Sequence, residues 1–181
     1  MKKSFVFSGS GGQGIMSAGI TLAHTAIEMG KHATYLPEYG PEQRGGSAKC
    51  TVVISDEPII SPLPKNCDVL VAMNNLAYGK FGEDVKSGGV LLANSVLVTD
   101  EITNEDCTII KAPVDDIALE IGDEKVANTV LIGILIGATD IVSKSAFELS
   151  IEDKFKDKKP QVLEMNLRAL QKGIEIGKEY K

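Results

Sequence analysis

The stretch Ser4-Phe5-Val6-Phe7-Ser8-Gly9-Ser10-Gly11-Gly12-Gln13-Gly14-Ile15 decides the fold of this chain. Its first five residues form a short run that is rich in strand-favouring side chains. Gly9 to Gly14 follow with the spacing G-x-G-x-x-G. Residues 15–29 then carry apolar side chains at helical spacing, and Gly30 stands where a helix is expected to end. The stretch therefore predicts a strand, a tight glycine turn and a helix.

The rest of the chain extends this unit into a layered fold. Residues 33–36 predict a second strand, so the first forty residues form a βαβ unit, which predicts a parallel sheet with a right-handed crossover. Further strands are predicted at 48–55, 68–72, 90–93 and 108–110, and helices at 75–81, 115–121, 128–138, 145–155 and 161–178. We therefore expect a three-layer, Rossmann-like α/β fold, with a mostly parallel sheet, helices on both faces and a helical C-terminal third.

Size, charge and cysteine content narrow the possible functions. The 181 residues fit one domain, 1–181. A net charge of −6 disfavours a nucleic-acid partner, and the longest apolar run, 130–138, is too short for a membrane span. Cys50, Cys67 and Cys107 stand far apart, so they predict neither an iron–sulfur nor a zinc site. Reduced thiols and the absence of a signal-peptide pattern predict a cytoplasmic protein.

The glycine turn has two interpretations when it is taken alone. Its glycines allow a sharp turn, a close approach to a ligand and close helix–strand packing, and the following helix offers free amide groups to an anion. A dinucleotide site also needs an acidic residue at the end of the second strand, and Glu38 stands near that place. No residue marks a hydride-transfer acid. A nucleotide-binding enzyme and an architectural turn without a ligand both remain open.

A second constrained loop follows, Tyr39-Gly40-Pro41-Glu42-Gln43-Arg44-Gly45-Gly46, whose glycines and proline exclude a regular element. Arg44 can hold a carboxylate or phosphate through two parallel hydrogen bonds. It can equally form an internal ion pair with Glu38 or Glu42 that pins the loop. A nicotinamide site does not require a loop of this kind.

The two loops together resemble the gamma subunit, or gamma domain, of the 2-oxoacid:ferredoxin oxidoreductases. The resemblance continues in order through residues 52–56, 60–62, 72–74, 80–81, 94–95 and 128–133. The amino-acid sequence of the second loop is most similar to that of the 2-oxoglutarate branch. The branched-chain 2-oxoacid and pyruvate branches are nearly as similar.

This resemblance implies an enzyme complex that oxidatively decarboxylates a 2-oxoacid to its acyl-CoA and passes the electrons to ferredoxin. It implies that thiamine diphosphate, magnesium and iron–sulfur clusters lie on other chains, with no cofactor on this one. The implied partners are alpha and beta subunits and a ferredoxin-like delta subunit. The chain also lacks a Gly-Asp-Gly…Asn-Asn pattern for thiamine diphosphate. We therefore expect a gamma-type domain that shapes and closes the active site, helps to assemble the complex and is inactive when isolated.

We expect no catalytic residue and no metal ligand on this chain. The residues expected to face CoA or the catalytic subunits are Gly9, Gly11, Gly12, Gln13, Gly14, Tyr39, Gly40, Pro41, Glu42, Arg44, Gly45 and Gly46. The two loops should lie together at one edge of the sheet, where the first two strands end. A pure assembly module whose glycine turn binds nothing remains an alternative.

Overall fold

The structure is a computed structural model that describes residues 1–40, 47–104 and 106–181. The strands of this part are β1 (Lys2–Ser10), β2 (His32–Tyr39), β3 (Ser47–Ser55), β4 (Cys67–Ala72), β5 (Val85–Asn94) and β6 (Thr108–Ala112). The helices are α1 (Ile15–Glu28), α2 (Asn75–Phe81), α3 (Val114–Ile121), α4 (Ala127–Thr139), α5 (Lys144–Phe155) and α6 (Pro160–Lys178), with short 3-10 turns at Gly82–Asp84 and Glu124–Val126. Each predicted strand and helix is present, most of them one or a few residues longer than expected.

The strands form one sheet in the order β2-β3-β1-β4-β5-β6. β1, β4, β5 and β6 pair in parallel, whereas β3 is antiparallel to both β1 and β2. β2 therefore runs in the same direction as β1 without being its neighbour. The mostly parallel sheet is confirmed. The βαβ unit predicts parallel pairing of its two strands, whereas β3 lies between them and is antiparallel to both. A short connection lets β3 return beside β2, because antiparallel neighbours need no crossover helix.

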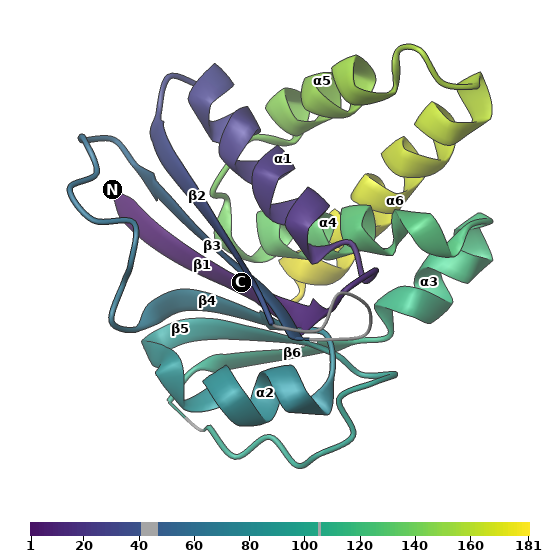
Figure 1. Cartoon of the computed structure of the whole chain (residues 1–181). Coiled ribbons are helices and arrows are strands. Elements are labelled where there is room, and N and C mark those ends of the chain that lie inside the picture. The colour runs from purple at the N-terminus through teal and green to yellow at the C-terminus, as the bar shows by residue number, and fades with distance from the viewer. Residues whose placement is uncertain (41–46, 105) are drawn as a thin grey trace.

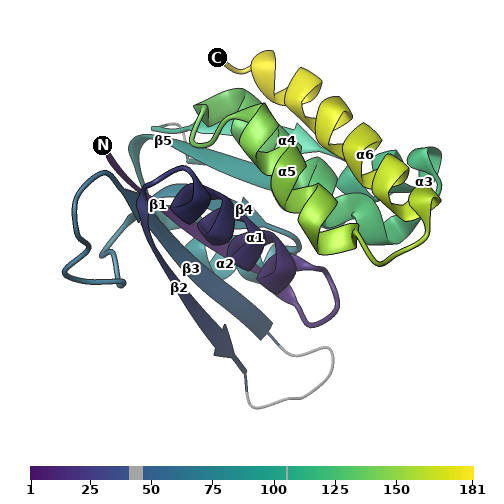
Figure 2. The same ribbon diagram turned by 90° about the horizontal axis from the view of Figure 1, so that it is seen from above.

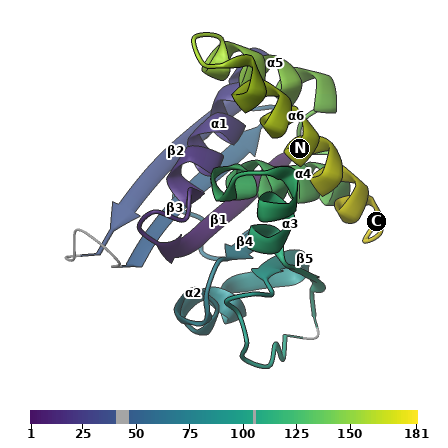
Figure 3. The same ribbon diagram turned by 90° about the vertical axis from the view of Figure 1, so that its right-hand side faces the viewer.

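Helices cover both faces of the sheet unequally (Figure 1). α1 and α4 lie on one face, and α5 and α6 pack against them from outside, as the turned view in Figure 2 shows. Among the described helices only α2 lies on the opposite face (Figure 3). A hydrophobic core lies on each face of the sheet, and side chains that alternate along β1 contribute to both. Phe5 and Phe7 point to the α1 face, whereas Val6 points to the α2 face.

Glycines allow α4 and α6 to pack at very short range. α4 is buried on nearly all sides, with Ile132, Ile134 and Leu135 within the core. A Cβ atom on Gly133 would lie only 2.5 Å from the carbonyl oxygen of Leu170, so any side chain there would force the helices apart. The close contact between α4 and α6 therefore depends on glycine at this position. Within the described chain, no helix has both the length and the apolar composition that a bilayer crossing demands.

Candidate functional site

Hydrogen bonds tie the glycine turn to the end of β4. The amide of Ser10 donates to Gln13 Oε1 at 2.6 Å, and Asn74 Nδ2 donates to Ser10 Oγ at 3.0 Å and to Gln13 Oε1 at 3.3 Å. Gln13 Nε2 in turn donates to the carbonyl oxygen of Met73 at 3.4 Å. Asn74 also caps α2, because its Oδ1 accepts the amide of Ala77. The turn is thus held rigidly, and the Gln13 side chain serves this purpose rather than pointing freely outward.

Gly14 connects the turn to both α1 and α4. It caps α1 in the left-handed conformation, with φ at +74°, which favours glycine. A Cβ atom there would lie 2.9 Å from Cβ of Asn128, near the start of α4. Among the described residues no side chain caps α1, and no acidic residue stands in its first turn, so the positive end of the helix dipole meets no described acidic group of that turn.

The glycine turn and the described ends of the second loop lie at the same edge of the sheet. Gly9 of β1 pairs with Ala48 of β3, which pairs on its other side with Tyr39 of β2. The amide of Gly40 donates to the carbonyl oxygen of Ser47 at 2.7 Å and closes the hairpin. The Tyr39 side chain is 72% exposed at this edge. Of the expected site residues, Pro41, Glu42, Arg44, Gly45 and Gly46 lie outside the described residues.

The position of Glu38 argues against a nicotinamide or flavin site at this turn. β3 separates Glu38 on β2 from the glycine turn, whereas a dinucleotide fold places the acidic residue on the neighbouring strand. The Glu38 carboxylate also lies 2.7 Å from Lys49 Nζ, so it already has a cationic partner. The expected ribose contact therefore does not form in this arrangement.

The described residues contain no cluster of three His, Cys, Asp or Glu side chains that could hold a metal ion. Cys50 and Cys67 are buried, and burial raises the pKa of each thiol to about 12. Both thiols therefore stay protonated at neutral pH and behave as small core residues. Burial also raises the pKa of Cys107.

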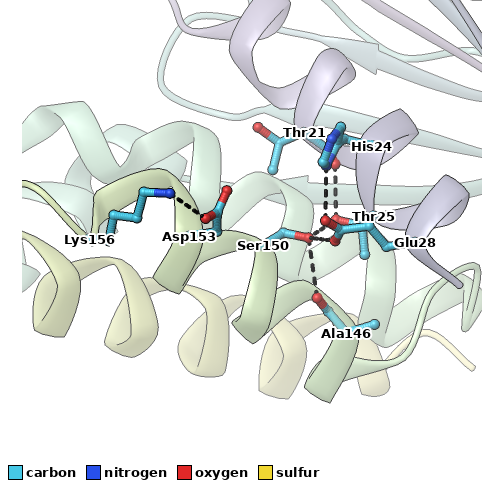
Figure 4. A network of polar contacts seen from close by, with 8 residues as sticks. All are labelled: Thr21, His24, Thr25, Glu28, Ala146, Ser150, Asp153 and Lys156. Carbon is cyan, nitrogen blue, oxygen red and sulfur yellow. Dashed lines mark hydrogen bonds and ion pairs between the residues drawn. The ribbon is translucent and has the colours of Figure 1, made fainter.

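A polar cluster between α1 and α5, in which Thr25 and Ser150 are buried and His24 and Glu28 are exposed, serves packing (Figure 4). Ser150 Oγ lies 2.7 Å from Thr25 Oγ1 and 2.9 Å from Glu28 Oε2, and His24 Nδ1 lies 3.3 Å from the other oxygen of Glu28. This cluster joins the two helices away from the glycine turn. His32 is an exposed residue at the start of β2. Neither histidine takes part in the candidate site.

Sequence reasoning named Gln13 but missed the two asparagines that fix the turn, Asn74 and Asn128. Asn74 carries a recognisable signal, because asparagine directly before a helical stretch is a favoured cap. Asn128 carries no such local signal, since its role depends on where α4 meets Gly14.

Comparison with known proteins connects this geometry to a family. The model of the family described as "Pyruvate ferredoxin/flavodoxin oxidoreductase" matches residues 4–176. The 2-oxoglutarate synthase subunit KorC of Methanocaldococcus jannaschii is 43% identical over 99% of this chain and 96% of its own length. The ketoisovalerate oxidoreductase subunit VorA of Methanothermobacter thermautotrophicus is 39% identical over 95% of this chain, which spans only 36% of that longer protein.

Solved structures support the same family assignment. The keto/oxoacid ferredoxin oxidoreductase gamma subunit from Geobacter sulfurreducens superposes with a TM-score of 0.86 and 36% identity, covering all of this chain and 99% of that one. A chain of the 2-oxoglutarate:ferredoxin oxidoreductase from Magnetococcus marinus, with 2-oxoglutarate, coenzyme A and succinyl-CoA bound, gives a TM-score of 0.90 and 27% identity over 99% of this chain and 32% of that one. The chain belongs to the pyruvate ferredoxin/flavodoxin oxidoreductase family and is a gamma subunit of a multi-subunit 2-oxoacid:ferredoxin oxidoreductase.

Proposed function

We propose that this subunit shapes and closes the active site of the complex through the sheet edge that carries its two loops. The observation that carries the proposal is the alignment of Gly9, Ala48 and Tyr39 across three neighbouring strands. This register brings the glycine turn and both described ends of the second loop to one surface. The N-terminus of α1, which no described side chain caps, adds the positive end of its helix dipole at the same place. Such a surface suits an anionic substrate or cofactor that is held between subunits.

The chemistry of oxidation is assigned to other chains of the complex. We infer that thiamine diphosphate, magnesium and iron–sulfur clusters are held there, and that alpha, beta and delta subunits and the acceptor ferredoxin are the partners. The bound coenzyme A and succinyl-CoA named for the Magnetococcus marinus enzyme support CoA as a ligand of the assembled complex. Co-purification of larger thiamine- and iron–sulfur-containing chains with this subunit from its source tests this assignment. Purification of the subunit alone, with its own oxidoreductase activity, would contradict it.

Arg44 is the residue through which the active-site role is best tested. The reconstituted complex carrying Arg44→Ala should show lower turnover in CoA-dependent viologen reduction, or a higher KM for one substrate. Arg168→Ala is the matched control, because Arg168 is the other arginine of the sequence and lies exposed on α6. A rise in the KM for CoA alone would indicate a phosphate contact, and a rise in the KM for the 2-oxoacid alone would indicate a carboxylate contact. Unchanged turnover and KM values for both substrates would refute a role for this loop.

We further propose that the 2-oxoacid is 2-oxoglutarate. The proposal rests on the KorC relative at 43% identity and on the amino-acid sequence of the second loop. The VorA relative at 39% identity supports a branched-chain substrate almost as well. The complex should therefore be assayed with 2-oxoglutarate, ketoisovalerate and pyruvate at equal concentrations. A higher kcat/KM for 2-oxoglutarate than for either competitor is expected. A higher kcat/KM for ketoisovalerate or for pyruvate would reject 2-oxoglutarate as the substrate.

A further inference from the structure

A continuous groove runs along the α2 face of the sheet. Near the amino end of β1 lies a hollow of about 550 Å³, and near its carboxyl end lies one of about 240 Å³ beside Tyr39. A third hollow, of about 190 Å³, joins them. It shares Leu63 and Lys65 with the first hollow and Lys49 and Phe81 with the second. We call the three together the basic groove.

The basic groove carries a charge opposite to that of the chain. Its lining contains five lysines and three acidic residues, whereas the whole chain has a net charge of −6. The lysines are Lys2, Lys49, Lys65, Lys80 and Lys86, and the acidic residues are Glu38, Asp68 and Asp84.

Only two of these lysines are neutralised within the described chain. Lys49 pairs with Glu38 at 2.7 Å, and Lys86 pairs with Asp68 at 2.9 Å. The other three, Lys2, Lys65 and Lys80, form no ion pair with any described residue. Asp84 is the one described acidic lining residue outside these two pairs, so the groove keeps a net positive charge along β1.

Its walls combine this charge with apolar surface. Leu63 is 60% exposed over the groove. The Phe81 ring lies below two ammonium groups, with Lys49 Nζ 5.2 Å and Lys80 Nζ 5.3 Å from the ring centroid. These distances allow cation–π attraction, which orders both lysines over the ring. Short α2 leaves this side of the sheet open, as Figure 3 shows, whereas the other side lies under several helices.

We propose that the basic groove binds an extended acidic segment of another subunit of the same enzyme. The chain belongs to a multi-subunit enzyme, so other subunits are available as partners. An extended segment fits because the groove follows the nine residues of β1, a length of about 25–30 Å. A small anion would fill one hollow, whereas the continuity of all three favours a polypeptide. Complementary charge of this kind sets the orientation of partners and speeds their encounter. The proposal rests on the family assignment and not on the active-site role of Arg44.

Lysine reactivity tests this proposal directly. The free subunit and the reconstituted complex should be acetylated with the N-hydroxysuccinimide ester of acetic acid, and each lysine quantified by mass spectrometry. Lys2, Lys65 and Lys80 should react several-fold more slowly in the complex. Carbodiimide treatment should also cross-link them to Asp or Glu residues of one partner subunit. Equal reactivity of all three lysines in both samples would overturn the proposal. The same protection in the isolated subunit at high concentration would also overturn it, because the occupant would then be a second copy.

Reversing the charge of lysines in the basic groove provides a second test of the proposal. The double variant Lys65→Glu/Lys80→Glu should bind the remaining subunits at least tenfold more weakly in 50 mM salt, with a smaller deficit in 300 mM salt. Lys158→Glu/Lys178→Glu is the matched control, because it makes the same charge change at exposed residues outside the groove. Equal weakening by the two variants would show that net charge alone matters and would reject the groove. The Arg44→Ala assay reports on turnover and KM, so either idea can fail while the other survives.

Discussion

Gly14 is a residue whose backbone and environment both exclude a side chain. Its left-handed φ costs an alanine about 1–2 kcal/mol, and the contact with Asn128 adds overpacking of about 1–3 kcal/mol. Gly30 has a similar φ of +77° but open space around its Cβ position. We therefore expect Gly14→Ala to lower the free energy of unfolding by about 2–5 kcal/mol and Gly30→Ala by only about 1–2 kcal/mol. Urea titrations of the two variants measure the difference. Equal losses would show that Asn128 yields without cost.

Two threonines differ in whether their hydroxyl groups are satisfied. Thr25 Oγ1 bonds to the carbonyl oxygen of Thr21 and contacts Ser150, whereas Thr34 Oγ1 is buried without a hydrogen-bond partner in the described chain. Thr25→Val should therefore destabilise the fold by about 1–2 kcal/mol, and Thr34→Val should stabilise it by about 0.5–1 kcal/mol. Thermal unfolding monitored by circular dichroism should show shifts of opposite sign. Destabilisation by both variants would contradict this account of Thr34.

Residue-scale prediction from sequence succeeded where the signal was local. The glycine spacing and the apolar periodicity of the helix that follows located the turn between residues 9 and 14. The sequence could not show that Gln13 and Asn74 bond to each other, because sixty residues separate them and only the parallel pairing of β1 with β4 brings them together.

At the scale of elements, the contact between α4 and α6 depends on the absence of side chains. A Cβ atom on Gly133 would meet the backbone of Leu170 and lie 2.9 Å from Cα of Gly173. Gly133→Ala and Gly173→Ala should each cost about 1–3 kcal/mol of stability. The double variant should cost less than the sum of the two, because the first alanine already moves the helices apart. Gly79→Ala on exposed α2 is the control and should be neutral or stabilising by up to about 1 kcal/mol. Strict additivity would contradict a shared contact.

Asp68 joins the starts of β1 and β4 and makes their pairing sensitive to acid. Burial raises its pKa, but hydrogen bonds from the Ser4 hydroxyl, Lys86 and the Ser4 amide together outweigh burial and lower the pKa below its usual value. A carboxyl group with a lowered pKa in the folded state stabilises the fold fully above its unfolded pKa of about 3.9 and loses that contribution as the pH falls further.

Asp68→Asn should therefore lower stability by about 1–2 kcal/mol at pH 7 through the weakened hydrogen bonds. It should also flatten the decline in stability below about pH 4. Urea unfolding between pH 7 and pH 3 measures both effects, with Asp116→Asn, an exposed change on α3, as the control. An equally steep acid decline in wild type and Asp68→Asn would exclude Asp68 as its source.

Element-scale prediction failed only at the β2 edge. Periodicity located each strand, but residues 48–55 look the same whether they pair in parallel or antiparallel. Partner choice depends on connection length and on which edge of the growing sheet is open, and neither is encoded in the strand's own side chains. The insertion of β3 is also what removed Glu38 from the neighbourhood of the glycine turn.

At the scale of the whole molecule, the net charge is negative although lysines gather along one groove, and composition alone does not show this distribution. The acidic total disfavours a nucleic-acid partner, but it gives no sign of the lysines along the basic groove. Those lysines come from β1, β3, α2, β5 and the segment before β4, so only folding brings them together. The loop edge differs in this respect, because both loops directly follow strands of one unit and the sequence could predict that they lie close together.

The rival view of the molecule as an independent dinucleotide-binding enzyme makes a different whole-molecule prediction. Its glycine turn would bind NAD or FAD in the isolated chain, with Glu38 holding the ribose. In the structure β3 separates Glu38 from the turn, and Lys49 already pairs with its carboxylate. Calorimetric titration of the isolated subunit with NAD and FAD should therefore show no saturable binding up to 1 mM, which corresponds to an affinity weaker than about −4 kcal/mol. Tight NAD binding that Glu38→Gln weakens at least tenfold would restore the rival, because it would require the turn and Glu38 to act on one ligand. Saturable binding that Glu38→Gln leaves unchanged would also contradict this expectation, and it would show that the turn holds the nucleotide as a general anion site without the acidic residue of a dinucleotide fold.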